Sequence, residues 1–86
     1  RAVRLGGEEF ALLLPETPLP QALRLAERLR RAVEAMAVPP VARITASFGG
    51  AEARPTDTPL TLLRRADEAM YRAKRKGKNR VEAAPK

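Results

Sequence analysis

The chain has 86 residues and contains neither cysteine nor histidine. This length allows one small domain with a narrow margin of stability, and the missing residue types exclude disulfides, thiolate or imidazole metal ligands and the usual neutral-pH base. The formal net charge is +7, and no apolar run approaches the roughly 20 residues that span a bilayer, so we expect a cytoplasmic protein without direct membrane contact.

The first elements read as two short strands, residues 2–5 and 9–14, separated by Gly6 and Gly7. A glycine pair between extended segments is typical of a hairpin turn. Thr17 before Pro18 then resembles a helix N-cap followed by proline at the first helical position.

The helix that follows is predicted to be amphipathic. Apolar residues recur at steps of three and four along one side, and Glu27–Arg31 and Arg30–Glu34 are spaced for i,i+4 ion pairs on the other. The predicted buried stripe consists of Ala22, Leu25, Ala26, Leu29, Ala32, Val33 and Met36.

After two prolines, residues 43–48 alternate as a strand with one covered face would. Thr58 before Pro59 repeats the cap signal and predicts a second helix, for which Gly77 is the left-handed stop. Residues 79–82 follow as a last short strand, and residues 83–86 are expected to be a disordered tail. The order strand-strand-helix-strand-helix-strand is an α/β fold in which helices cover the sheet.

The excess positive charge is concentrated near the end of the chain. Residues 1–70 carry ten basic and nine acidic side chains, whereas six of the nine residues 72–80 are basic. Any anion-binding role therefore falls on this segment. Because the chain has three aromatic residues, stacking on bases is a weak interpretation and we expect no specific nucleic-acid partner.

The motif with the clearest chemistry is Gly6-Gly7-Glu8-Glu9-Phe10. Glycines at a turn let backbone N–H groups approach a ligand, and carboxylates beside them suit a hard cation that bridges to phosphate. Because successive strand residues point to opposite faces, we expect only one of Glu8 and Glu9 to be a direct metal ligand. From residue types alone, a simple acidic hairpin with Phe10 in the core is the favoured explanation of the motif.

The segment beginning at Arg4 resembles the signature of the diguanylate cyclase family, whose GGDEF motif has GGEEF as its accepted variant. Ser47-Phe48-Gly49 is similar to a second family block, and residues 66–80 resemble the family's closing helix and loop. The resemblance covers residues 1–82 and implies the C-terminal half of a GGDEF domain, with the nucleotide-cyclase-like, ferredoxin-like palm fold.

The resemblance implies condensation of two GTP molecules into cyclic di-GMP with release of pyrophosphate, each domain of a dimer holding one GTP. Glu8 matches the acid that binds Mg²⁺ and serves as base for the attacking 3′-hydroxyl, and Glu9 matches a neighbouring acid that is a further metal contact or lies behind it. Gly6 and Gly7 match the glycines against which GTP lies. Two phosphate-binding positions are matched by Lys74 and Lys78.

The half of the domain that would supply a metal-binding aspartate, guanine recognition and a complete site for two Mg²⁺ ions is absent from these residues. We therefore expect little cyclase activity from this chain by itself, and a homodimer or strand-exchanged oligomer because sheet edges are exposed. Two alternatives remain at this point: a non-catalytic nucleotide-binding or dimerisation module of the same fold, and polyanion binding through residues 72–80.

Overall fold

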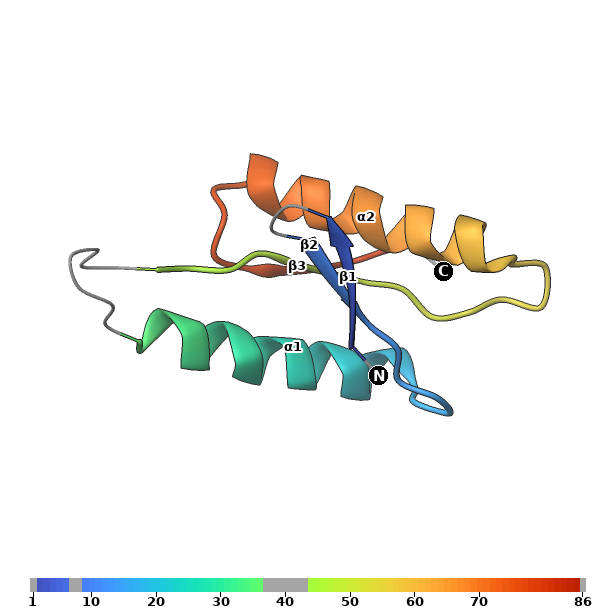
Figure 1. Ribbon diagram of the computed structural model, residues 1–86, viewed down its shortest axis with the longest axis horizontal. Helices are drawn as coiled ribbons and strands as arrows, with labels where there is room; N and C mark the ends of the chain where they lie inside the picture. Colours follow the sequence, from blue (N-terminus) through green and yellow to red (C-terminus); the bar gives the residue numbers. More distant parts are fainter. Residues whose placement is uncertain (1, 7–8, 37–43, 86) are drawn as a thin grey trace.

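The computed structural model describes residues 2–6, 9–36 and 44–85, with the backbone alone described for residues 2–6, 9 and 10. The elements, in order, are β1 (Ala2–Gly6), β2 (Glu9–Leu12), α1 (Leu19–Glu34), β3 (Phe48–Gly50), α2 (Pro59–Arg75) and β4 (Val81–Ala83). This order confirms the predicted α/β class and the predicted succession of elements (Figure 1).

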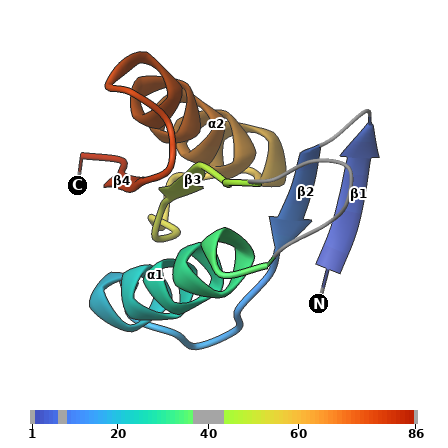
Figure 2. The ribbon, with the colours of Figure 1, turned by 90° about the vertical axis from the view of Figure 1, so that its left-hand side faces the viewer.

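The helices lie on opposite sides of a parallel strand pair. Phe48 of β3 pairs with Val81 of β4 and Gly50 pairs with Ala83, so α2 is the crossover of a β-α-β unit. Figure 2 shows α2 on one side of this pair, α1 on the other, and the antiparallel β1–β2 hairpin beside them.

Small residues let α2 approach β3 very closely. A Cβ placed on Gly49 would lie 2.2 Å from the Ala66 carbonyl oxygen and 2.2 Å from the Met70 nitrogen. Ala69 and Ala73 on the same helix are fully buried. The helix therefore packs backbone against backbone here, where larger side chains would hold the two elements apart.

The two helix starts differ in how they are capped. The Thr58 hydroxyl oxygen accepts a hydrogen bond from the Thr61 N–H, and the Thr61 hydroxyl accepts one from the Thr58 N–H, which confirms the predicted cap of α2. The prediction that Thr17 caps α1 is wrong. Pro18 is the cap residue, and the Thr17 hydroxyl donates instead to the Pro15 carbonyl at 3.0 Å.

A distant carboxylate takes over the role expected of Thr17. The Leu19 N–H, at the first position of α1, donates to Glu52 Oε1 at 2.7 Å across 33 residues of sequence. A negative charge at this position also complements the positive end of the helix macrodipole. The start of α1 is thus fixed against the segment that follows β3.

The strand predicted over residues 43–48 is shorter than expected, and Arg43 lies outside the described residues. Residues 44–47 belong to no helix or strand, and the pairing with β4 begins at Phe48. The disordered tail expected from Ala83 is wrong for its first two residues. Ala83 belongs to β4, and Ala84 is buried and donates its N–H to the Gly50 carbonyl at 2.8 Å.

The predicted apolar stripe of α1 is partly wrong at its C-terminal end. Ala32 and Met36 are exposed, whereas Leu19, at the start of the helix, is buried. The buried residues lie at the start of α1, on α2 and directly after β4. Within the described ranges, neither helix has the length and apolar character that a membrane span requires.

Candidate functional site

The β1–β2 hairpin carries the acidic motif near its tip. Val3 pairs with Ala11 and Arg4 with Phe10, but Gly6 then pairs with Glu9, so the register shifts before the tip. Such an irregularity bends a strand and redirects the residues around it. Gly7 and Glu8 lie outside the described residues, as does the side chain of Glu9.

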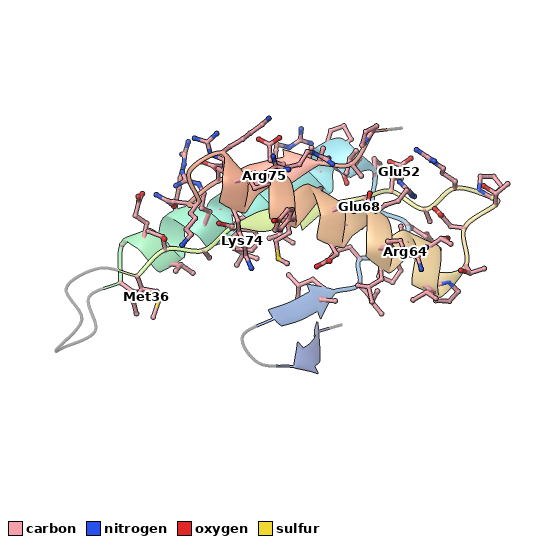
Figure 3. All side chains as sticks on the ribbon, turned by 90° about the horizontal axis from the view of Figure 1, so that it is seen from above. Met36, Glu52, Arg64, Glu68, Lys74 and Arg75 are labelled. Carbon is pink, nitrogen blue, oxygen red and sulfur yellow. The ribbon has the colours of Figure 1, made fainter. Side chains whose placement is uncertain are left out.

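The end of the hairpin that bears Gly6 lies toward α2, whereas the start of β1 lies toward α1 (Figures 1 and 2). Figure 3 shows Lys74 on the side of α2 where the hairpin lies, while Arg75 points away from it. The structure therefore places one of the two predicted phosphate-binding lysines on the hairpin's side of the molecule.

Three of the basic side chains in and after the last turns of α2 are engaged within the protein. Arg72 donates to the carbonyl oxygen at the end of β4 at 2.9 Å, and the Arg75 guanidinium lies 5.8 Å from the centre of the Tyr71 ring. Lys76 pairs with Glu82 at 2.9 Å. This hydrogen bond from Lys76 is the main cause of a lowered pKa for Glu82.

Lys74 and Lys78 make no such contacts. Both are exposed, and neither side chain has a hydrogen-bonding or charged partner within residues 2–6, 9–36 and 44–85. Arg80 is exposed too and makes no side-chain hydrogen bond or ion pair within these ranges, although its charge contributes to the lowered pKa of Glu82. The two lysines assigned to phosphate from the sequence are thus, together with Arg80, the cations of this segment that remain available to a ligand.

In the loop after α2, the backbone N–H groups of residues 76–78 are already hydrogen-bonded, so a ligand there would be bound by side chains. The N–H groups of Lys76 and Gly77 donate to Arg72 and Lys74 carbonyls, and the Lys78 N–H donates to the Ala73 carbonyl at 3.0 Å. The φ angle of Gly77 is 125°, which confirms the predicted left-handed stop. Since this loop follows a helix C-terminus, where the macrodipole repels anions, lysine charge must provide any attraction for phosphate.

A polar network that the sequence reasoning missed holds this loop against α1. Arg30 donates to Asn79 Oδ1 at 2.9 Å, Asn79 Nδ2 donates to the Glu34 carboxylate, and the Asn79 N–H donates to Ser47 Oγ at 3.2 Å. These contacts join residues 32 to 49 positions apart. An asparagine two residues after the predicted left-handed Gly77 was the available signal, because asparagine tolerates that conformation.

Arg30 is oriented by a two-point contact with Glu27. Its Nε and one terminal nitrogen donate to the two carboxylate oxygens, both at 2.7 Å. The hydrogen bond from Arg30 is the main cause that lowers the pKa of Glu27 from 4.5 to about 2. The predicted pairs Glu27–Arg31 and Arg30–Glu34 are both present, at 2.9 and 3.6 Å.

A shallow depression of about 230 Å³ lies at the other end of the helices, beside Leu19, Glu52 and Arg65. Its charged groups are already used: Glu52 caps α1, and Arg65 pairs with Asp57 and donates to the Glu52 carbonyl. Figure 3 shows Glu52 well away from Lys74. We therefore assign this depression to structure rather than to the candidate site.

The expected metal ligands are not among the side chains that the structure describes. Within the described part of the chain, no three acidic side chains converge on a point that could hold a cation. The predicted donors, Glu8 and Glu9, present carboxylate oxygens, which match the preference of Mg²⁺ for hard ligands. A magnesium site at the hairpin thus remains a prediction from the motif.

Known proteins are similar to this chain over most of its length. The family model described as "Diguanylate cyclase, GGDEF domain" matches residues 1–80. The chain is 48% identical over 81 residues to diguanylate cyclase DgcM of Escherichia coli K12, and 44% identical over 84 residues to the response regulator PleD of Caulobacter vibrioides. These matches cover 94% and 91% of this chain but 20% and 18% of the relatives.

Solved structures agree with the family match. The GGDEF domain of DgcB from Caulobacter crescentus, crystallised with c-di-GMP, superposes with a TM-score of 0.89 at 36% identity. The active GGEEF domain of a diguanylate cyclase from Vibrio cholerae gives 0.90 at 31%. This chain is covered to 96% and 99%, and spans 52% and 56% of the two domains. The chain therefore belongs to the GGDEF domain family and contains about half of such a domain.

Proposed function

We propose that this chain is the C-terminal part of a GGDEF domain in a longer protein that condenses two GTP molecules into cyclic di-GMP and releases pyrophosphate. The family match, the likeness to a structure crystallised with c-di-GMP and the named diguanylate cyclases among the relatives support this proposal. GTP is the substrate, and the protein works in the cytoplasm, where GTP is available.

The observation that carries the proposal is that some basic side chains in and after the last turns of α2 have partners within the fold and others do not. Arg72, Arg75 and Lys76 are engaged within the fold, whereas Lys74, Lys78 and Arg80 have no side-chain hydrogen bond or ion pair among the described residues. A general polyanion surface would leave most of its cations free. Both lysines that match the family's phosphate-binding positions are among the free cations, which suits the binding of a triphosphate.

Glu8 and the glycines before it complete the proposed site. We assign Gly6 and Gly7 to close approach of the nucleotide, Glu8 to Mg²⁺ and to the proton of the attacking 3′-hydroxyl, and Glu9 to a supporting metal contact. When bound, Mg²⁺ would neutralise charge that develops on the phosphates during attack. Lys74 and Lys78 would bind the phosphates through charge-assisted hydrogen bonds.

Each proposed half-site holds one GTP, so the reaction needs two domains facing each other, and we propose a homodimer as the active form. Residues 1–86 by themselves offer one metal-binding motif and no described guanine-binding element. One or two carboxylates anchor a strongly hydrated ion weakly. We therefore expect negligible turnover from this chain in isolation.

The test is cyclic di-GMP formation by the complete protein with GTP and Mg²⁺. Glu8→Gln should abolish turnover while a GTP analogue lacking the 3′-hydroxyl still binds, and Lys74→Ala should weaken that binding by about tenfold, the loss of one charge-assisted phosphate contact. Lys76→Ala is the matched control, since its charge is already paired with Glu82. Normal turnover by Glu8→Gln would overturn the catalytic assignment, and analogue binding without turnover by the unaltered protein would favour a nucleotide-binding module.

A further inference from the structure

Three consecutive residues after α2 have positive φ: Gly77 at 125°, Lys78 at 64° and Asn79 at 49°. Glycine adopts such angles freely and asparagine tolerates them, but a lysine does so only where its surroundings impose the conformation. Lys78 is also one of the two lysines proposed to bind the triphosphate. The conformation of this residue therefore depends on whatever fixes its neighbours.

The neighbours are fixed on both sides. On the helix side, the Lys78 N–H donates to the Ala73 carbonyl at 3.0 Å. On the other side, Asn79 is held by its backbone N–H, which donates to Ser47 Oγ, and by both ends of its side-chain amide. The amide bridges Arg30 and Glu34 of α1, so these hydrogen bonds attach the loop after α2 to α1.

The far end of this connection is itself rigid. Arg30 is 15% exposed and gripped by both carboxylate oxygens of Glu27, which leaves a terminal nitrogen aimed at Asn79 Oδ1 at 2.9 Å. Because Asn79 accepts from a cation and donates to an anion, its amide is oriented in one sense only. An aspartate at this position could accept a hydrogen bond from Arg30 but could not donate one to the Glu34 carboxylate.

We propose that Asn79 is a positioning residue for GTP binding: by bridging Arg30 and Glu34, it holds Lys78 in the left-handed conformation that presents its ammonium group to the triphosphate. This inference rests on the proposed function. Asn79 does not touch the nucleotide and acts through Lys78, so its loss should weaken binding of the phosphates in the ground state and the transition state alike.

The experiment measures calorimetric affinity for the GTP analogue lacking the 3′-hydroxyl, together with KM and kcat for GTP, in the complete protein. Asn79→Gly keeps the left-handed backbone accessible and removes only the bridge. We expect its affinity to fall and its KM to rise by about five- to tenfold, with kcat within about twofold. The double variant Asn79→Gly/Lys78→Ala should be no weaker than Lys78→Ala, because the two residues act as one unit.

A pair of substitutions that conserves net charge tests the positioning role of Asn79 separately from its effect on folding. Asn79→Asp places a carboxylate against Glu34 and should weaken analogue binding, and adding Glu34→Gln restores a donor opposite that carboxylate and should recover the affinity. Recovery would support positioning even if Asn79→Gly unfolds. Lys76→Ala again serves as the control.

The outcomes separate the two proposals. If Lys78→Ala weakens binding while Asn79→Gly, in a folded protein, does not, the positioning role is overturned and the proposed function stands. Additive losses in the double variant would also overturn it. If neither Lys74→Ala nor Lys78→Ala alters analogue binding, the phosphate assignment itself fails and the positioning role falls with it.

Discussion

At the scale of single residues, Gly49 sets the distance between β3 and α2. A methyl group at this position would meet backbone atoms of Ala66 and Met70 at 2.2 Å. Backbone in a helix cannot move aside without displacing the helix. We predict that Gly49→Ala destabilises the complete domain by about 3 kcal/mol, at the upper end of overpacking effects, as measured by chemical denaturation.

Gly50 provides the control for this prediction. A Cβ there would meet Leu23 Cδ2 at 3.0 Å and Leu19 Cδ1 at 3.6 Å, which are the ends of side chains that can rotate. Gly50→Ala should therefore cost clearly less than Gly49→Ala. Equal losses from the two variants would show that the close approach of α2 is not what requires glycine at position 49.

At the scale of elements, the two helices start with similar sequences but different caps. Thr58 exchanges hydrogen bonds with Thr61, whereas Thr17 makes none with α1. We predict that Thr58→Ala lowers the free energy of unfolding by about 1 kcal/mol, while Thr17→Ala changes it by less than about 0.5 kcal/mol. Chemical denaturation of the two variants checks this, and a larger loss at Thr17 would contradict it.

The ion pairs of α1 predict a dependence on pH. The pKa of Glu27 is lowered from 4.5 to about 2, mainly by Arg30. Between these values the unfolded chain binds more protons than the folded one, so the contribution of Glu27 is complete above pH 4.5 and is lost as the pH falls toward 2. Unfolding curves measured through this range should therefore show a less steep loss of stability for Glu27→Gln.

The contribution of Glu27 to the pH dependence should be sensitive to solvent exposure and to salt. The Glu27 side chain is 36% exposed, so screening reduces the effect and added salt should reduce it further. Glu68→Gln is a suitable control, because Glu68 is exposed on α2 and forms no ion pair within the described residues. An acid limb that is unchanged by Glu27→Gln would show that the pair with Arg30 does not contribute.

At the scale of the whole molecule, the sequence predicted what local patterns encode. The order of elements, the Thr58 cap and the Gly77 stop follow from periodicity and from the conformational limits of proline and glycine, and all three are confirmed. The family, and with it the assignments of Glu8 and Lys74, came from a motif rather than from physical chemistry. The metal and substrate roles of these residues stay predictions.

What the sequence did not predict depends on contacts between distant segments. Glu52 replaces Thr17 at the start of α1, and Asn79 reaches α1 across more than forty residues. Periodicity placed Met36 in the core, yet Met36 is 53% exposed, because periodicity identifies the apolar face of a helix but not how far along the helix its packing partners extend. Local patterns carry no information about such contacts.

The composition of the core leads to a last prediction. Among residues with described side chains, the buried apolar ones are Leu19, Ala69, Ala73 and Ala84, and no large side chain is fully buried. Leu12, on β2, is 47% exposed, and β2 pairs only with β1 among the described strands. An exposed strand edge with an apolar side chain favours pairing between copies.

We therefore expect residues 1–86, prepared without further chain, to self-associate, with a sedimentation coefficient that rises over about a hundredfold range of concentration. Leu12→Lys should shift the distribution toward monomer, because a charge on an edge strand opposes pairing. Leu60→Lys makes the same chemical change at a 63% exposed position on α2 and should leave the association unchanged. A single monomeric species at every concentration would show that the hairpin edge is protected within one chain, and equal effects of the two lysines would point to general charge repulsion instead of strand pairing.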